Sequence, residues 1–235
     1  MNFNFSSMGI ISSCYKEKFG IPRQPGLVKS AIAELHLNKQ FGEECVRGLD
    51  GFSHLWISFI FHETHQQGWH SMVRPPRLGG NTKIGVFASR SPFRPNPLGL
   101  SVVELLAIEK RQSGIVLQLG SCDFLDKTPV LDIKPYLPYV DALPEAKGGF
   151  ANIMPEIKMK VGFTEQALEQ CDLAEKRLNS EIKKIIIEIL QLDPRPSYQQ
   201  NKVTERIYAM KLFDFDLSWQ YCDNSTITVL GLSLS

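Results

Sequence analysis

Two loops rich in arginine and proline carry the side chains with the clearest chemical potential. They cover residues 74–81 and 89–99. No Asp or Glu occurs within residues 64–103, although this stretch holds five basic residues and a local charge of +5. The whole chain has a net charge of only +1. Basic charge is thus concentrated in one segment, which favours binding of phosphate or another anion. Neutralisation by acidic residues from elsewhere in the fold is the alternative.

Prolines stiffen both loops. Arg74, Arg94 and Asn96 each precede a proline, which biases their backbone toward extended conformations, and each proline fixes its own φ. The loops therefore display guanidinium and amide groups at low entropic cost. Since the planar guanidinium matches phosphate or carboxylate, the pattern favours a ligand site. A rigid brace at the rim of the fold is the alternative.

A pair of carboxylates forms the second candidate. Asp123 and Asp126 flank two apolar residues, Phe124 and Leu125, at the end of an expected strand. Carboxylates in this position can accept hydrogen bonds from a ribose diol or an ammonium group. The continuation to Thr128 and a proline is also typical of a turn, and the spacing alone favours the turn.

Histidines form the third candidate. Four of the five histidines lie close together in the sequence, within residues 54–70. They are His54, His62, His65 and His70. The three-residue step from His62 to His65 lacks the spacing of the zinc-protease motif. We expect no metal site, and a metal hydrolase built on these histidines is the alternative.

Absent motifs exclude several classes of enzyme. The chain has no glycine-rich dinucleotide fingerprint, no phosphate-binding loop and no nucleophile elbow, which argues against dinucleotide enzymes, P-loop NTPases and α/β-hydrolases. The five cysteines are scattered, without a Cys-x-x-Cys pair, as is typical of free thiols in a reducing compartment. The start of the chain shows no secretory signal and no apolar run could cross a bilayer. We expect a cytoplasmic protein without a membrane partner.

The elements that must position these residues are mainly strands. Twelve of the 14 prolines lie within residues 22–155, which disfavours long helices there. Short β-branched or aromatic runs bounded by Gly, Pro or Asp predict strands. These runs cover residues 8–12, 31–37, 54–62, 83–88, 100–109, 115–119, 130–134 and 157–163. Many short strands without intervening helices indicate an antiparallel β-barrel.

A different pattern begins near residue 164. Apolar residues recur at helical spacing over residues 168–189, behind Thr164 as an expected N-cap. Asn179-Ser180 is expected to cap a second helix. Residues 207–221 then predict one strand with Ile207 and Ala209 on its buried face, followed by a hairpin return over 226–230. The predicted fold is therefore mainly β, with a barrel domain over residues 1–160 and a small α+β domain over 161–235.

The motifs taken together resemble one family. Residues 85–99, with the ordered run from Gly85 to Gly99, are similar to the signature of the TsaA-like (TrmO-type) proteins. Residues 22–26, 74–81 and 123–136 match as well, and residues 193–198 are similar to the C-terminal extension of the bacterial members. The resemblance implies a homodimeric β-barrel methyltransferase that uses S-adenosylmethionine. Its expected substrate is tRNA, methylated on the exocyclic nitrogen of threonylcarbamoyladenosine at position 37, beside the anticodon.

The resemblance also implies site residues. Those expected at the cofactor are Pro22, Arg23, Gln24, His62, Glu63, Arg90, Leu100, Asp123, Phe124, Leu125 and Asp126. Asp126 is our hypothesis for the base that removes the proton, with water as the alternative. The residues expected to contact the tRNA anticodon loop are Arg74, Arg77, Lys83, Arg94, Asn96, Lys134 and Arg195. A non-catalytic RNA-binding barrel is the rival interpretation, and cofactor titration separates the two.

Overall fold

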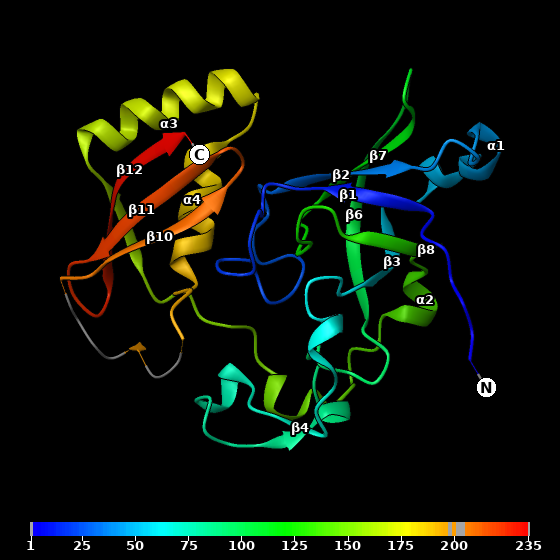
Figure 1. Ribbon diagram of the computed structural model, residues 1–235, viewed down its shortest axis with the longest axis horizontal. Helices are drawn as coiled ribbons and strands as arrows, with labels where there is room; N and C mark the ends of the chain where they lie inside the picture. Colours follow the sequence, from blue (N-terminus) through cyan, green and yellow to red (C-terminus); the bar gives the residue numbers. More distant parts are fainter. Residues whose placement is uncertain (1, 197–198, 201–204, 235) are drawn as a thin grey trace.

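The computed structural model describes residues 2–196, 199–200 and 205–234. These residues form two parts that lie side by side along the longest axis (Figure 1). One part is a β-barrel, and the other packs two helices against a small sheet. The predicted fold class is therefore confirmed.

Six strands close the barrel in the order β1-β2-β7-β6-β3-β8, and all neighbours are antiparallel. Their bounds are β1 Gly9–Ser12, β2 Ile32–Leu37, β3 His54–Ile60, β6 Leu98–Arg111, β7 Gly114–Gly120 and β8 Pro129–Pro135. Closure leaves no unpaired strand edge, which is how antiparallel sheets of this size satisfy their backbone groups. The strands predicted here are confirmed, with ends that differ by a few residues.

Strand β3 shows how the sequence fixes the barrel core. Leu55, Ile57 and Phe59 are buried, while the residues between them are partly exposed. Period-two alternation places one face of each strand toward the core, where a buried large apolar side chain contributes about 1.5–3 kcal/mol. Gly99, opposite Phe59 in β6, leaves room for its ring, because a Cβ atom there would lie 2.1 Å from the ring.

The C-terminal part is a four-stranded sheet with the order β10-β11-β12-β9 and two helices. Its elements are β9 Lys160–Phe163, α3 Glu165–Leu178, α4 Ile182–Gln191, β10 Ile207–Leu212, β11 Phe215–Tyr221 and β12 Thr226–Leu234. β9 runs parallel to β12 at the sheet edge. Thr164 caps α3, accepting a hydrogen bond from the Ala167 amide at 3.1 Å, which confirms the predicted helix start.

Residues 207–221 form a hairpin and not the single strand that the alternation predicted. Phe213 and Asp214 make a two-residue turn, with Phe213 at φ 54°. Such a turn moves the buried positions from even to odd numbers, so the predicted burial of Ile207 and Ala209 is wrong. The residues buried on β10 are Tyr208, Met210 and Leu212. No glycine marks the left-handed turn residue, which is why the pattern concealed it.

Three other predictions need correction. Asn179 ends α3 in the left-handed conformation, and α4 begins after Glu181 without a side-chain cap. The strand expected over 83–88 is only β5, Ile84–Gly85, paired with β4, Met72–Val73, and followed by a 3₁₀ turn. The strand expected over 157–163 is β9, which joins the C-terminal sheet.

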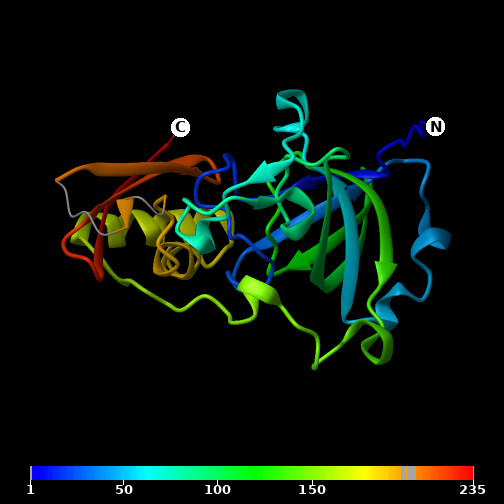
Figure 2. The same ribbon diagram turned by 90° about the horizontal axis from the view of Figure 1, so that it is seen from below.

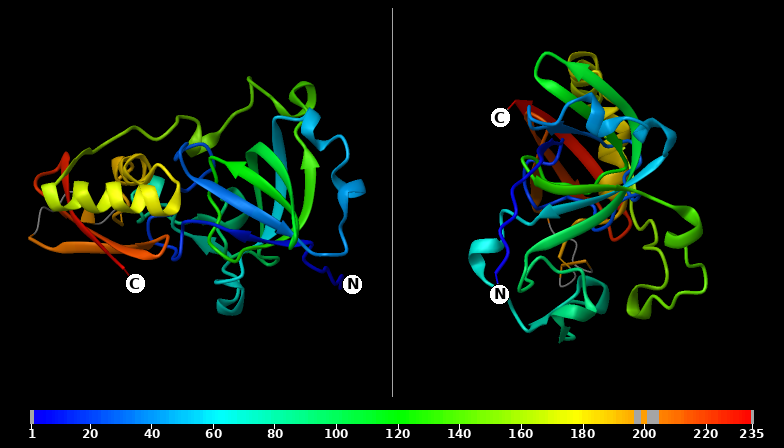
Figure 3. Two further views of the ribbon diagram at one scale, coloured as in Figure 1. Left: turned by 90° about the horizontal axis from the view of Figure 1, so that it is seen from above. Right: turned by 90° about the vertical axis from the view of Figure 1, so that its right-hand side faces the viewer.

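Short elements complete the fold. Helix α1 covers Glu43–Val46 and helix α2 covers Pro138–Asp141. Single 3₁₀ turns occupy Leu49–Gly51, His65–Gln67, Pro76–Leu78, Val86–Ala88 and Gly149–Ala151. An irregular connection leads from α2 along one side of the molecule to β9 (Figures 2 and 3). No helix among the described residues is long and apolar enough to cross a membrane.

The segment between β1 and β2 joins the two parts. Cys14, Tyr15, Val28 and Ala31 are buried in the same apolar cluster as the helices and sheet of the C-terminal part. The Phe213 amide donates to the Cys14 carbonyl at 2.7 Å. Phe19 and Ile21 pack against this shared core, which anchors the chain directly before residues 22–24. The predicted domain boundary at 160/161 stays a prediction.

Candidate active site

One pocket of about 500 Å³ gathers most of the residues expected at the cofactor. Five separate segments supply most of its lining: residues 21–24, 59–64, 89–94, 98–101 and 123–128. Nine of the eleven expected residues lie there. They are Pro22, Arg23, Gln24, His62, Glu63, Arg90, Leu100, Asp123 and Leu125. A volume of this size is ordinary for a small-molecule site.

The barrel strands and the long β3–β6 connection build this pocket. Ile60 pairs with Leu98 where β3 ends and β6 begins, so the connection between them leaves and returns at the same edge. Within it, Arg90 donates from Nη1 to Gln24 Oε1, which links the connection to the segment between β1 and β2. Arg94 donates from Nη1 to the carbonyls of Val86 (3.2 Å) and Ser89 (2.6 Å). Arg94 therefore braces the loop from inside.

Asp123 is a half-buried acid of the pocket. Ser101 Oγ donates to its Oδ1 at 2.8 Å. Burial raises the pKa of Asp123 to about 6, against opposing effects of the Ser101 hydrogen bond and the Arg90 charge. The carboxylate forms no ion pair with a described residue. It is thus a desolvated charge available to an ammonium or hydroxyl group.

Arg23 extends the pocket toward the C-terminal part. Desolvation lowers the pKa of its guanidinium, and the charge of Asp193 acts in the opposite direction. Arginine remains protonated in proteins despite such shifts. Arg23 and Arg90 therefore place two cations in the pocket that holds the Asp123 carboxylate.

The structure separates two expected residues from this pocket. Phe124 is buried in the barrel core, with its ring edge-on to Phe59 at 5.1 Å. Asp126 accepts a hydrogen bond from the Ser13 amide at 2.9 Å and pairs with Lys16 at 2.9 Å. Neither residue is among those that line the pocket, and the predicted cofactor contacts of both and the predicted base role of Asp126 stay predictions. The Asp126 carboxylate also holds the chain turn, through its contacts with the Ser13 amide and Lys16.

The expected tRNA contacts fall into three groups. Arg74 and Lys83 line a second pocket of about 280 Å³ with His70, Ser91 and Phe93. Arg77 donates from Nη2 to the Ile153 carbonyl, and Arg94 lies in the first pocket. Asn96 and Lys134 are exposed and line neither pocket, and Lys134 pairs with Asp132.

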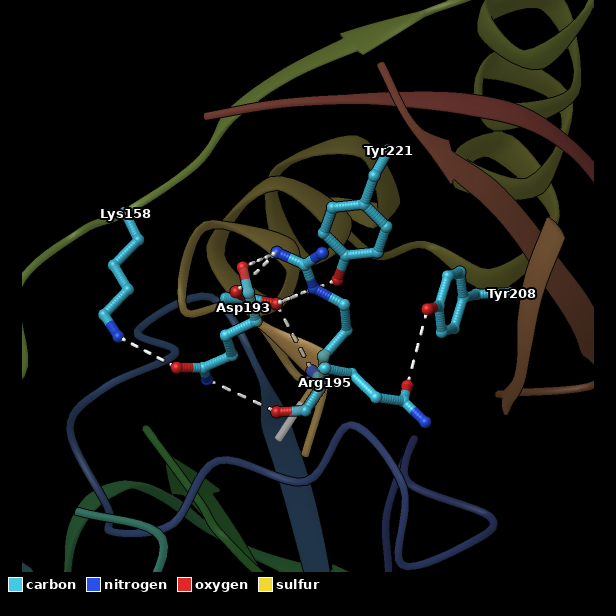
Figure 4. Close-up of polar contacts among 7 residues, drawn as sticks. Lys158, Asp193, Arg195, Tyr208 and Tyr221 are labelled. Atoms are coloured by element: carbon cyan, nitrogen blue, oxygen red, sulfur yellow. Dashed lines mark hydrogen bonds and ion pairs between the residues drawn. The ribbon is translucent and has the colours of Figure 1, made fainter. Parts of the chain in front are cut away.

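Arg195 is buried in the C-terminal part, and its predicted contact with RNA stays a prediction. Its Nε and Nη2 atoms each donate to Asp193 at 2.9 Å, and its guanidinium lies 3.6 Å from the ring centre of Tyr221 (Figure 4). The Tyr221 hydroxyl donates to Asp193 Oδ1 at 3.0 Å, and Arg195 also donates to the Gln200 carbonyl at 3.1 Å. The guanidinium therefore stabilises the core and the chain that follows α4.

Sequence reasoning missed Ser101 and Lys18. Ser101 is a buried hydroxyl on β6, and Lys18 donates from Nζ to the Glu63 carbonyl at 3.1 Å beside the pocket. Ser101 carries a usable signal, since it is a polar residue on the buried face of a strand. Within the described ranges, no three or more His, Cys, Asp or Glu side chains are grouped to hold a metal ion.

A closed β-barrel, a desolvated acid, three pocket arginines (Arg23, Arg90 and Arg94) and an acid-free loop together have the chemistry of a site for a charged small molecule. The family of tRNA-methyltransferase O matches this chain over both parts. Its N-terminal domain model covers residues 10–142 and its C-terminal domain model covers residues 156–235. The chain belongs to this family.

Several known proteins are similar over nearly the full length. The tRNA (adenine(37)-N6)-methyltransferase of Escherichia coli K12 is 49% identical over 223 residues, covering 94% of each chain. A putative S-adenosylmethionine-dependent methyltransferase of Pseudomonas aeruginosa is 42% identical over 234 residues, covering 99% of each. The crystal structure of TrmO from Pseudomonas aeruginosa superposes with a TM-score of 0.83 at 36% identity and covers 99% of both chains.

Proposed function

We propose that this protein is an S-adenosylmethionine-dependent tRNA (adenine37-N6)-methyltransferase, which methylates N6 of threonylcarbamoyladenosine. The observation that carries the proposal is the first pocket. Asp123 and Arg90 line it without an ion-pair partner among the described residues, beside a loop that is free of acidic residues. The family membership and the relatives that carry this activity in their names support the assignment. The proposal places the enzyme in the cytoplasm, where tRNA is found.

The side chains in the pocket fit the chemistry of the cofactor. Arg90 and Arg23 suit its carboxylate, and the Asp123 carboxylate suits its ammonium or its ribose diol. Leu100, Leu125 and the aromatic rings of β3 provide apolar surface for its adenine. When bound, S-adenosylmethionine supplies an electrophilic methyl group on a positively charged sulfur.

The residues contribute by binding, orienting and desolvating. A carboxylate placed against a sulfonium would stabilise the charged ground state more than the transition state, because the charge disappears during transfer. Asp123 therefore serves better at the ammonium or the diol. Rigid loops around a partly desolvated pocket hold the reacting groups in line, which is a large contribution to catalysis of this kind.

The acid-free connection provides the surface for tRNA. Its exposed arginines and lysine can contact backbone phosphates, which position RNA without reading its sequence. A base in a single-stranded loop can be splayed into a pocket at low cost. Position 37 lies in such a loop, beside the anticodon.

We further propose that the protein acts as a homodimer. The connection between the two parts exposes several large apolar side chains on one stretch of chain, which is typical of an interaction surface. Those most exposed are Tyr139, Leu143, Ile153, Met154 and Ile157. Light scattering of the purified protein tests this: a dimer mass is expected, and a monomer mass at micromolar concentration contradicts it.

Methyl transfer to defined tRNA tests the proposed function. We expect the purified protein and S-adenosylmethionine to convert threonylcarbamoyladenosine 37 to its N6-methyl form, detected by mass spectrometry of the nucleosides. Asp123→Asn should lose most of this activity, whereas Arg177→Ala, a surface variant in the C-terminal part, should keep it. RNA binding without cofactor binding or methyl transfer would instead indicate a non-catalytic RNA-binding barrel.

A further inference from the structure

One stretch of the β3–β6 connection separates two pockets. Arg90, Pro92 and Arg94 line the first pocket, and Ser91 and Phe93 line the second. Successive side chains of an extended chain point to opposite sides, which explains this alternation. The two pockets are therefore divided by the thickness of a single strand of chain.

Serine hydroxyls hold this dividing chain in place. The Ser91 amide donates to Ser89 Oγ at 3.3 Å, and the Phe93 amide donates to Ser91 Oγ at 3.3 Å. Ser89 Oγ donates in turn to the Val86 carbonyl at 2.8 Å. The wall between the pockets is thus preorganised, and a ligand meets it without ordering the loop first.

Two cations, Arg74 and Lys83, line the second pocket. Met72 pairs with Gly85 and Val73 with Ile84, and Arg74 and Lys83 are the residues next to the Val73–Ile84 end of this short ladder. Both line the pocket, and neither contacts a carboxylate within the described part of the chain. Two like charges that line one pocket repel each other. An anion between the two would relieve this repulsion and satisfy both side chains.

Aromatic rings form the rest of the second pocket. The rings of His70 and Phe93 lie 5.2 Å apart at 44°, and the His70 amide donates to the Phe93 carbonyl at 3.2 Å. Met72 lies beside them and is half exposed. Sites that bind a nucleotide of single-stranded RNA commonly combine cations for its phosphate with an aromatic surface on which its base stacks.

We propose that the second pocket binds the nucleotide adjacent to the methylated adenosine in the anticodon loop. Its phosphate lies between Arg74 and Lys83, and its base stacks on Phe93 and His70. This inference rests on the proposed function. The chain wall at residues 89–94 then separates two neighbouring bases, so that the target enters the first pocket while its neighbour stays outside. The subsite would hold the loop open during methyl transfer.

A coupling experiment tests the stacking. We would measure the affinity of the full-length protein for an anticodon stem–loop RNA with an abasic residue at position 36 or 38. Loss of one stacked base should weaken binding by wild type about tenfold at one of the two positions. In Phe93→Leu, which retains apolar bulk, intact RNA should bind about tenfold more weakly and the abasic residue should add less than about twofold. An equal abasic penalty in both proteins at both positions would overturn the proposal.

The phosphate contacts are tested through the salt dependence of binding. Arg74→Ala and Lys83→Ala should each reduce the slope of log affinity against log salt by about 0.7, as expected for one contact to a single strand. Lys110→Ala, on the far part of β6 where it pairs with Glu43, should leave the slope unchanged. Unchanged slopes in both pocket variants would contradict the phosphate site.

Two readouts keep this test separate from that of the proposed function. The pocket variants should bind S-adenosylmethionine like wild type, which shows that the fold and the first pocket are intact. Methyl transfer by wild type together with wild-type RNA affinity in Arg74→Ala, Lys83→Ala and Phe93→Leu would overturn the subsite alone. Failure of wild type to methylate tRNA would overturn the proposed function itself.

Discussion

Asp193 and Arg195 form an ion pair with each other, whereas Asp123 and Arg90, which are the same residue types, do not. In the C-terminal part, Asp193 and Arg195 are buried and donate to or accept from each other directly, with Tyr221 closing the group. In the first pocket, Asp123 accepts from the neutral Ser101 hydroxyl and Arg90 donates to the neutral Gln24 amide. The first pair satisfies its own charges, and the second leaves them for a ligand.

This contrast shows what separates a structural arginine from a binding one. Arg195 and Arg94 each stand before or between prolines, and the sequence gives both the appearance of displayed cations. The difference lies in the partner: a carboxylate for Arg195 and loop carbonyls or neutral amides for the pocket arginines. Unsatisfied charge in a preorganised pocket is the feature that indicates function.

We expect the greatest loss of stability when the buried pair of Asp193 and Arg195 is broken. Arg195→Met leaves the Asp193 carboxylate buried without its counter-ion. Removal of one partner of a buried pair costs about 3–5 kcal/mol, so the free energy of unfolding should fall by that amount. Urea unfolding followed by circular dichroism measures it, and a loss below about 1 kcal/mol would place the pair among weak surface contacts.

Removal of the Arg90 guanidinium should weaken the binding of S-adenosylmethionine and leave the stability of the fold unchanged. Arg90→Ala removes the charge-assisted contact that we propose to the cofactor carboxylate, and such a contact is worth about 1.5–3 kcal/mol. The KM for S-adenosylmethionine should therefore rise about 10- to 100-fold, while the free energy of unfolding stays within about 0.5 kcal/mol of wild type. An unfolding change as large as that of Arg195→Met would remove the contrast between the two regions.

The pH dependence of cofactor affinity sharpens the role of Asp123. Its pKa of about 6 lies above that of an unfolded carboxyl. The free energy of unfolding therefore decreases as pH rises through about 6 and the carboxyl ionises in the folded protein. In the opposite direction, the negative charge available to an ammonium group disappears as pH falls through about 6. From pH 7 to pH 5, affinity for S-adenosylmethionine should fall about tenfold.

Asp123→Asn provides the control for this profile. The variant carries no carboxylate, so its weaker affinity should stay nearly constant between pH 5 and pH 7. It should also be more stable than wild type at pH 7, because a desolvated charge has been removed. Titration calorimetry and thermal unfolding at both pH values measure the two quantities. A wild-type pH slope retained in the variant would assign the titration to another group.

The smallest expected effect belongs to Ser101. Ser101→Ala removes the hydrogen bond that lowers the pKa of Asp123, so the pH midpoint of cofactor binding should move upward. Near pH 7 the affinity should fall severalfold, by roughly 1 kcal/mol. Ser101→Thr should restore it, and a midpoint that does not move in Ser101→Ala would contradict the positioning role.

Local patterns predicted much of the fold because burial on one face of a strand imposes a visible period. Strand β3 shows this, since its buried residues alternate strictly. The hairpin at Phe213 escaped because no turn residue marks it and the alternation continues across it with a change of phase. The role of β9 escaped because parallel pairing with β12 depends on the distant end of the chain.

The site was predictable in part. Motif resemblance brought together nine residues of the pocket, because the motifs themselves are the loops that line it. It does not distinguish these from Phe124, Asp126 and Arg195, whose side chains hold the loops or the core and do not line the pocket. Burial and partners decide between these roles, and both depend on contacts with remote segments such as Ser13 and Tyr221.

Isothermal titration of the cofactor-free protein with S-adenosylmethionine tests the central claim most directly. We expect saturable binding near one site per chain in wild type and Arg177→Ala, and binding at least about tenfold weaker in folded Arg90→Ala. Absence of saturable binding in folded wild type, or equal affinity in Arg90→Ala, would contradict the claim that this pocket leaves its charges for the cofactor.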